Sequence, residues 1–230
     1  MNLIIIIMFL IVILLVMAKV YDINMRKLKQ FVEYEETKFN KIVDSYPSNI
    51  EICKAILKKL NNNKVKIEED KEAKTSMYIA VSDKITIADV KNSYTRVQTI
   101  AHECLHSIQS RKIQLFNFVY SNIYLLYFII VTILALLNKL QDSMLYISIM
   151  AILSYIYYFI RSYLENDAMI KAKYLAEDFM NEAEVSSKDE IDKIVKSYER
   201  LNDMGIKTVN YQLMLGTLIK VIILAIAFLI

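Results

Sequence analysis

The chain has 230 residues, 56% of them hydrophobic, and its 28 basic and 25 acidic side chains give a formal net charge of +3. These charges form no arginine-rich run, and there is no glycine-rich phosphate loop, so we expect no nucleic-acid partner. Two glycines and one proline are too few for a turn-rich sandwich or barrel, and two cysteines are too few for a disulfide framework. We therefore expect a mainly α-helical protein with reduced thiols.

The first predicted element is an uncharged run at residues 3–17, which residues 18–21 can lengthen at a membrane interface. Because about 20 apolar residues span a bilayer, we expect residues 1–20 to form an N-terminal transmembrane anchor. A cleaved signal peptide is the alternative interpretation. It is disfavoured because no basic residue precedes the run and Met17-Ala18-Lys19 is a poor cleavage site.

A polar segment at residues 21–115 comes next. From residue 23 to about residue 61 its apolar side chains recur at helical spacing, with a break near Tyr46-Pro47-Ser48. Three consecutive asparagines at residues 61–63 then predict a loop. This part of the segment is therefore expected to form two helices.

The second part of the polar segment changes its period from helical to two. Residues 77–81 and 84–88 alternate apolar and polar side chains around Ser82-Asp83, which predicts a small β-hairpin. A helix is predicted to start at about residues 93–95 and to carry the sequence His102-Glu103-Cys104-Leu105-His106.

Two uncharged stretches, residues 116–137 and 143–160, are separated by only five residues and predict a transmembrane helical hairpin at 116–163. A polar helical segment at 164–210 follows, with a break and a new N-cap at Ser186-Ser187-Lys188-Asp189. Residues 211–230 predict a fourth span. The expected fold is thus mainly α and membrane-embedded, with about four transmembrane helices and one β-hairpin.

Lys220 is the one charged residue within the fourth predicted span. An ionisable residue at that depth is a candidate functional residue. The alternative is that its long side chain snorkels to the interface or pairs with a neighbouring helix.

The orientation of the chain is predicted from its positive charges. The two polar segments with their membrane-flanking residues, 18–115 and 161–211, hold 26 of the 28 lysines and arginines, and an even number of spans separates them. The positive-inside rule therefore places both segments in the cytoplasm and both termini outside, as in a multi-pass cell-membrane protein.

The only two histidines of the chain, His102 and His106, are four residues apart and so project from one face of the predicted helix. Two such imidazoles can bind Zn²⁺. Glu103, next to the first histidine, can act as general base toward a water on the metal. The β-hairpin before the helix fits zinc peptidases, in which an edge strand beside the metal pairs with the substrate. Two surface histidines on a helix are the alternative.

A catalytic zinc site needs a third protein ligand, and with no third histidine it must be a carboxylate. The first acid after the chain returns from the membrane hairpin is Glu165, which we predict as that ligand. Ala168 and Ala172 share its helix face and are small enough for close approach to the motif helix. Asp167 is offset by about 200° and is expected to be solvated or to neutralise a helix N-terminus.

The remaining candidates are less specific. Cys104 points away from both histidines and is expected to pack in the helix interface, with a redox switch as the alternative. An oxyanion-stabilising residue stays open among Arg161, Arg200 and Tyr211.

The stretch His102 to Gln109 resembles the HExxHxxQ helix of bacterial YugP-like membrane zinc metallopeptidases. In that family a transmembrane hairpin and an E-x-D-A segment follow the motif, as Glu165-Asn166-Asp167-Ala168 does here. More distantly the chain resembles gluzincins of the HtpX and CAAX-prenyl-protease group. The resemblance implies zinc binding by His102, His106 and Glu165, with Glu103 as base. It departs at Leu105, where the family usually has glycine.

The sequence thus predicts a membrane-bound zinc metalloendopeptidase that acts on peptides or membrane proteins at the cytoplasmic face. A non-catalytic membrane scaffold or sensor with structural zinc is the alternative. A third possibility is a transporter-like bundle in which Lys220 is the working residue.

Overall fold

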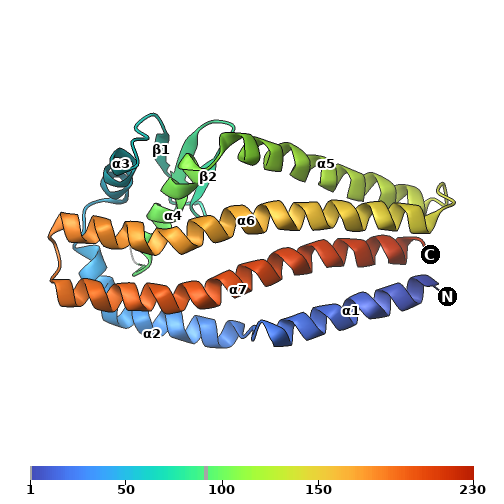
Figure 1. The fold of residues 1–230 in the computed structure, drawn as a ribbon, viewed down its shortest axis with the longest axis horizontal. Coiled ribbons are helices and arrows are strands. Elements are labelled where there is room, and N and C mark those ends of the chain that lie inside the picture. The colour runs from blue at the N-terminus through green and yellow to red at the C-terminus, as the bar shows by residue number, and fades with distance from the viewer. Residues whose placement is uncertain (1, 91–92) are drawn as a thin grey trace. The chain divides into compact units, whose positions relative to one another are not determined.

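Seven helices and a three-stranded sheet make up the part of the chain that the computed structural model describes, residues 2–90 and 93–230 (Figure 1). The predicted mainly α architecture is confirmed. The chain divides into two units, which are described separately. They are the apolar unit, formed by Met1–Ile23, Leu115–Tyr163 and Lys207–Ile230, and the polar unit, formed by Asn24–Gln114 and Leu164–Ile206.

Among the described residues, four helical stretches are long and apolar enough to cross a membrane, as the sequence predicts. They contain α1 (Asn2–Val20), α5 (Arg111–Leu136), α6 (Ser143–Ala183) and α7 (Lys188–Ala227). Each stretch contains a window of 18 residues with high mean hydropathy and at most two charged residues, which is long enough to cross most of a bilayer.

The apolar unit buries side chains of α5, α6 and α7 in its core, has partly buried side chains on α1, and leaves large apolar side chains on its outside. Its core includes Tyr124, Met150 and Leu224, while Leu15 and Tyr155 are 67% and 68% exposed. Exposed apolar surface of this extent is unfavourable in water but not in lipid. The surface of this unit is therefore suited to a hydrocarbon environment.

The polar unit begins with α2 (Met25–Asp44) and α3 (Asn49–Lys59), which are separated at the predicted break. Pro47 disfavours helical backbone in the residue before it, and Ser48 starts α3 with a capping box to Glu51. The break therefore has two causes, the backbone restriction by Pro47 and the capping box of Ser48 and Glu51, and both can be recognised in the sequence.

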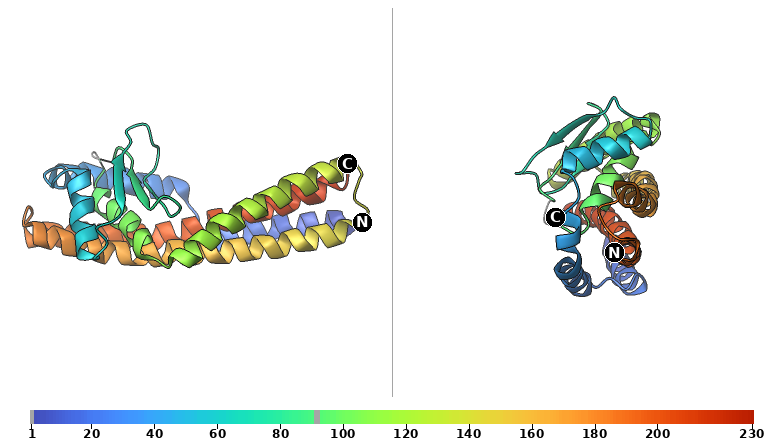
Figure 2. Two further views of the ribbon diagram at one scale, coloured as in Figure 1. Left: turned by 90° about the horizontal axis from the view of Figure 1, so that it is seen from above. Right: turned by 90° about the vertical axis from the view of Figure 1, so that its left-hand side faces the viewer.

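The predicted β-hairpin is confirmed, and a third strand joins it. Strand β2 (Met77–Ile79) pairs antiparallel with β3 (Lys84–Ile87), and β1 (Lys66–Glu69) pairs with β3 in parallel. The order β1-β3-β2 leaves β2 at an edge. The sheet lies against α3 and α4 (Arg96–Ile108), as Figure 2 shows.

The helix that carries the two histidines ends before the next helix begins. Gln109 has an extended conformation with φ −63° and ψ 159°, and its backbone N–H bonds back to the last turn of α4. Helix α5 then starts at Arg111, five residues earlier than the uncharged stretch that predicts it. Polar residues at its start do not prevent helix formation, which is why hydropathy alone misplaces this boundary.

Helices α6 and α7 each run without a break from one unit into the other. The expected break between them is confirmed: Glu184 has a φ of +51°, and Ser187 caps α7 in a capping box with Glu190. Within the polar unit α7 packs closely on α6, since a Cβ on Gly205 would lie 2.9 Å from Cε of Met169.

Candidate metal centre

The first turn of α4 is fixed by a buried arginine. Arg96, 1% exposed, donates from Nε to Oδ1 of Asn49 at 2.6 Å and from its terminal nitrogens to the carbonyls of Val43 and Pro47. These acceptors lie at the corner between α2 and α3. Because the guanidinium has several donors in a rigid plane, it sets the direction of α4 as well as its position.

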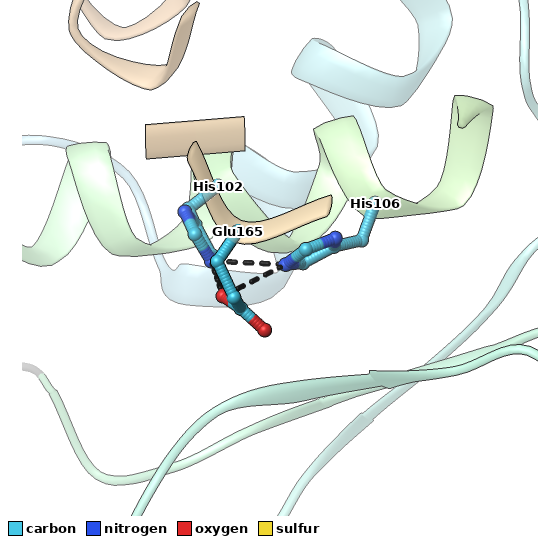
Figure 3. A group of neighbouring side chains, drawn as sticks. All are labelled: His102, His106 and Glu165. Carbon is cyan, nitrogen blue, oxygen red and sulfur yellow. Dashed lines mark hydrogen bonds and ion pairs between the residues drawn. The ribbon is translucent and has the colours of Figure 1, made fainter. Parts of the chain in front are cut away.

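One face of α4 is apolar and the other carries the histidines. Val97, Ile100 and Cys104 are completely buried in the core of the polar unit. His102 and His106 project from the opposite face toward Glu165, as Figure 3 shows, and remain partly exposed. The amphipathic pattern of the helix therefore presents both imidazoles on one side.

The structure brings His102, His106 and Glu165 together. Nε2 of His106 lies 3.0 Å from Nε2 of His102. Oε2 of Glu165 lies 3.5 Å from Nε2 of His102 and 3.6 Å from Nε2 of His106. A tetrahedral Zn²⁺ bound at ~2.0–2.1 Å would hold its ligand atoms ~3.3–3.4 Å apart. The three atoms thus fit one metal ion with small adjustments (Figure 3).

Glu165 is delivered by the part of α6 that belongs to the polar unit. Ala168 and Ala172, one and two turns further along, are buried in its core, as expected from their small size. A larger side chain at either position would push α6 outward. The close packing of α6 therefore contributes directly to the position of the carboxylate.

Gln109 connects the two helices that supply the ligands. Its Nε2 donates to the carbonyl of Leu164 at 2.8 Å and to Oδ2 of Asp167 at 3.0 Å. Since its amide nitrogen is a donor to both, its oxygen accepts from Nδ1 of His106 at 2.8 Å. This bond places the ring proton on Nδ1 and leaves Nε2 free to bind a metal.

Asp167 does not neutralise a helix N-terminus, and its side chain, still 27% exposed, makes a contact that the sequence does not predict. Its carboxylate accepts a bond from Gln109 and forms an ion pair with Lys171, so it supports the ligand residues indirectly. It is also far from the start of α6 at Ser143 and cannot neutralise that terminus. A helical wheel of α6 alone does not reveal this role, because Gln109 approaches from another element.

Glu103 is 7% exposed and lies beside the strand at the sheet edge. Burial raises the pKa of its carboxyl above the ordinary value, and the nearby charge of Glu165 acts in the same direction. His102, His106 and a hydrogen bond from the backbone N–H of Tyr78 oppose this shift. The sequence predicts the hairpin but not this contact of Tyr78.

His106 experiences two opposing influences. Burial alone would lower the pKa of its imidazole, but the carboxylate of Glu165 and the oxygen of Gln109 raise it above the ordinary value. The site therefore attracts positive charge in the position where two imidazoles and a carboxylate converge.

The other candidates lie away from the three ligand atoms or in the other unit. Cys104 is completely buried, and its Sγ is 3.6 Å from Sγ of Cys53 on α3, which confirms its packing role. Arg200 is exposed on α7, whereas Arg161 and Tyr211 belong to the apolar unit. The structure therefore gives no reason to assign Arg161, Arg200 or Tyr211 as the oxyanion-stabilising residue.

No family model, curated protein or solved structure matches this chain. The resemblance to YugP-like peptidases consequently depends on the residues around the two histidines and Glu165. The function of the chain therefore follows from the geometry and chemistry of that site.

Proposed function

We propose that the chain is a membrane-embedded zinc metalloendopeptidase. The observation that carries this proposal is the convergence of Nε2 of His102, Nε2 of His106 and Oε2 of Glu165 at ligand spacing, beside the buried carboxylate of Glu103. Zn²⁺ is the metal of choice because two imidazoles and one carboxylate form a common catalytic zinc set.

The protein residues divide the work between binding and proton transfer. His102, His106 and Glu165 hold the ion, while Gln109 keeps His106 in the required tautomer. Zinc bound there would lower the pKa of a water toward ~7 and polarise a peptide carbonyl. Glu103 accepts the water proton and returns it to the leaving amine. Its raised pKa brings it closer to the working pH of a general base.

Strand β2 is a suitable guide for an extended substrate. It is an edge strand of its sheet, and the backbone of Tyr78 lies close enough to the Glu103 carboxyl to lower its pKa. A peptide that adds to this edge by main-chain hydrogen bonds runs past the general base. Such pairing recognises backbone more than side chains, so we propose an endopeptidase of broad sequence preference.

The membrane sets the class of substrate. We place the four apolar helical stretches across a bilayer and the polar unit on the cytoplasmic side, where the positive-inside rule puts its lysines and arginines. Proteins with segments close to the inner membrane surface are then the expected substrates.

The metal set favours catalysis over a structural zinc site. A structural site is usually closed by four protein ligands, whereas a catalytic site keeps one position open. Within the described residues the ligand group contains three members only. Glu103 is outside that group, which is the position expected of a base.

The test uses the full chain purified in detergent. Wild-type protein is expected to bind one zinc per chain and to cleave unstructured polypeptides. Glu103→Gln should keep the zinc and lose at least ~100-fold in cleavage rate, and Glu165→Ala should lose the zinc. Glu177→Gln, on the same helix as Glu165, is the matched control and should behave as wild type. Zinc-free wild-type protein, or full activity in Glu103→Gln, would refute the proposal.

A further inference from the structure

Three helices of the polar unit meet at one buried amide. Asn202 lies on α7 and is 7% exposed. Its Oδ1 accepts from Nε2 of Gln98 on α4 at 2.5 Å, and its Nδ2 donates to the carbonyl of Met169 on α6 at 2.8 Å. A single side chain of α7 therefore joins the two helices that carry the candidate metal ligands.

The two residues bonded to this amide each lie one helical turn from a candidate ligand. Gln98 comes four residues before His102 on α4, and Met169 comes four residues after Glu165 on α6. Because residues four apart are neighbours on one helix face, the contact lies directly beside the face that presents the ligand. A movement of either helix at this contact is consequently passed on to a ligand.

A second link lies on the other side of the three candidate ligands. Gln109 donates to the carbonyl of Leu164, which directly precedes Glu165. This link joins the end of α4 to an earlier turn of α6 than the link through Asn202 does, so the two helices run in opposite directions past the site. The ligands thus lie between two hydrogen-bonded links, one through Gln109 and one through Asn202.

An asparagine suits this position because its amide offers an acceptor and a donor at once. Gln98 is 7% exposed as well, so water does not readily replace the bond between the two amides. Oε1 of Gln98 makes no hydrogen bond with any residue that the structure describes, which leaves its Nε2 and Asn202 to hold the side chain. Loss of the Asn202 amide therefore leaves α4 and α6 without this link.

Helix α7 is held in place by contacts on both sides of Asn202. One turn earlier, the hydroxyl of Tyr198 donates to the carbonyl of Tyr94 at 2.7 Å, and the two rings stack at a centroid distance of 5.9 Å. Three residues later, the close approach of Gly205 to Met169 keeps α7 against α6. Removing the Asn202 amide should therefore change the spacing between α4 and α6 and leave the fold intact.

Metal binding depends on that spacing. The ligand atoms of His102, His106 and Glu165 lie 3.0, 3.5 and 3.6 Å apart, close to the ~3.3–3.4 Å of a tetrahedral zinc site. A binding constellation has to be held within about 0.5 Å of its working geometry. A helix that loses one of its links to its neighbour would move its ligand by a comparable amount.

We propose that Asn202 is a positioning residue of the metal centre, which holds α4 and α6 at the spacing that the three ligands require. It touches neither the metal nor the substrate and acts through Gln98 and the backbone of Met169. This inference rests on the proposed function, since it takes His102, His106 and Glu165 to bind a metal ion.

The test compares metal binding by variants of the full chain purified in detergent. Asn202→Leu has a similar volume but neither bond, so its zinc affinity should fall about 10- to 100-fold in competition with a chelator. Cobalt(II) bound in place of zinc should show a shifted visible absorption spectrum, because that spectrum reports coordination geometry. Gln98→Leu breaks the same link from α4 and should give a similar loss. The double variant should bind zinc no more weakly than either single variant, since the link is lost only once.

Phe179→Leu is the control for general destabilisation. Phe179 is buried in the same core, fourteen residues after Glu165 and about 21 Å further along α6. This variant should lower the thermal midpoint and keep the zinc affinity and the cobalt spectrum of wild type. If Asn202→Leu does not fold, Gln98→Leu carries the test.

Wild-type zinc affinity with an unchanged cobalt spectrum in Asn202→Leu would overturn the inference, as would an equal loss of affinity in Phe179→Leu. Failure of the proposed function gives a different result. A wild-type protein that binds zinc but cleaves no polypeptide would refute the peptidase, and the affinities of the Asn202 and Gln98 variants would still decide the positioning role. A wild-type protein that binds no zinc would refute both.

Discussion

Nδ1 of His106 donates to Oε1 of Gln109 at 2.8 Å, and the same amide donates to the carbonyl of Leu164. One side chain thus fixes the tautomer of His106 on α4 and the position of the α6 turn that carries Glu165, the third member of the candidate metal centre. Because Gln109 is extended and not helical, its side chain can turn back toward both helices. The end of α4 at Ile108 is therefore part of the construction of the site.

Replacing Gln109 with Ala is expected to weaken zinc binding by about 10- to 100-fold, since the tautomer and the α4–α6 link are lost together. Gln109→Glu keeps the acceptor for His106 but loses the donor to Leu164, so its affinity should be intermediate. Competition with a chromogenic chelator measures both values. Gln30→Ala, exposed on α2, is the control. An affinity of Gln109→Ala within twofold of wild type would contradict this role.

Zinc should also stabilise the polar unit, because it joins α4 to α6. At a free concentration a thousand times its Kd, the expected gain is about 4 kcal/mol. A chelator should therefore lower the thermal midpoint of the protein and increase amide hydrogen exchange in both helices. His102→Ala should show neither response. The same chelator effect in that variant would show that zinc stabilises another part of the chain.

The sequence predicts helices, and side chains that converge, well where the signal is local. The spacing of His102 and His106, the break at Pro47 and the apolar stretches all depend on neighbouring residues or on regular periods. Glu165 is predicted from topology, because a helical hairpin returns the chain to its starting side. Ala168 and Ala172 support that prediction, as both are buried.

Contacts between distant segments are much less accessible. The sequence analysis predicts the hairpin but not strand β1, which is only four residues long. The alternation of Val65 and Ile67 with charged neighbours is the sequence signal that indicates it. The bond from Gln109 to Asp167 and the N–H of Tyr78 at Glu103 connect elements whose relative positions no periodicity encodes. Supporting residues are consequently harder to predict than ligands.

Arg96 provides a stability test. Arg96→Leu removes the donors to Asn49 and to two backbone carbonyls and leaves these acceptors without partners in a buried corner. We expect a loss of about 3 kcal/mol in the free energy of unfolding. Urea unfolding followed by circular dichroism measures it. Arg200→Leu, exposed on α7, should change stability by no more than ~0.5 kcal/mol. Similar small effects of both substitutions would refute the anchoring role of Arg96.

The start of α3 should depend on pH through Glu51. The hydroxyl and N–H of Ser48 donate to its carboxylate and hold its pKa below the ordinary value of 4.5. Stability from the ionised form is therefore present above pH 4.5 and lost as the pH falls through the lowered value. The thermal midpoints of wild type and Glu51→Ala should converge in that range. Glu72→Ala, in an exposed loop, should show no such convergence.

The two cysteines link the motif helix to α3 and give a test of its packing. Sγ of Cys104 is 3.6 Å from Sγ of Cys53, and both are completely buried. The contact with Cys53 raises the pKa of the Cys104 thiol well above its ordinary value and burial raises it further, so little thiolate exists at neutral pH. Ellman's reagent should therefore label neither cysteine in the native protein and both after denaturation. Cys104→Ser should be less stable than Cys104→Ala, because its hydroxyl is more costly to bury than a methyl group. Rapid labelling of the native protein would show that α3 separates readily from α4.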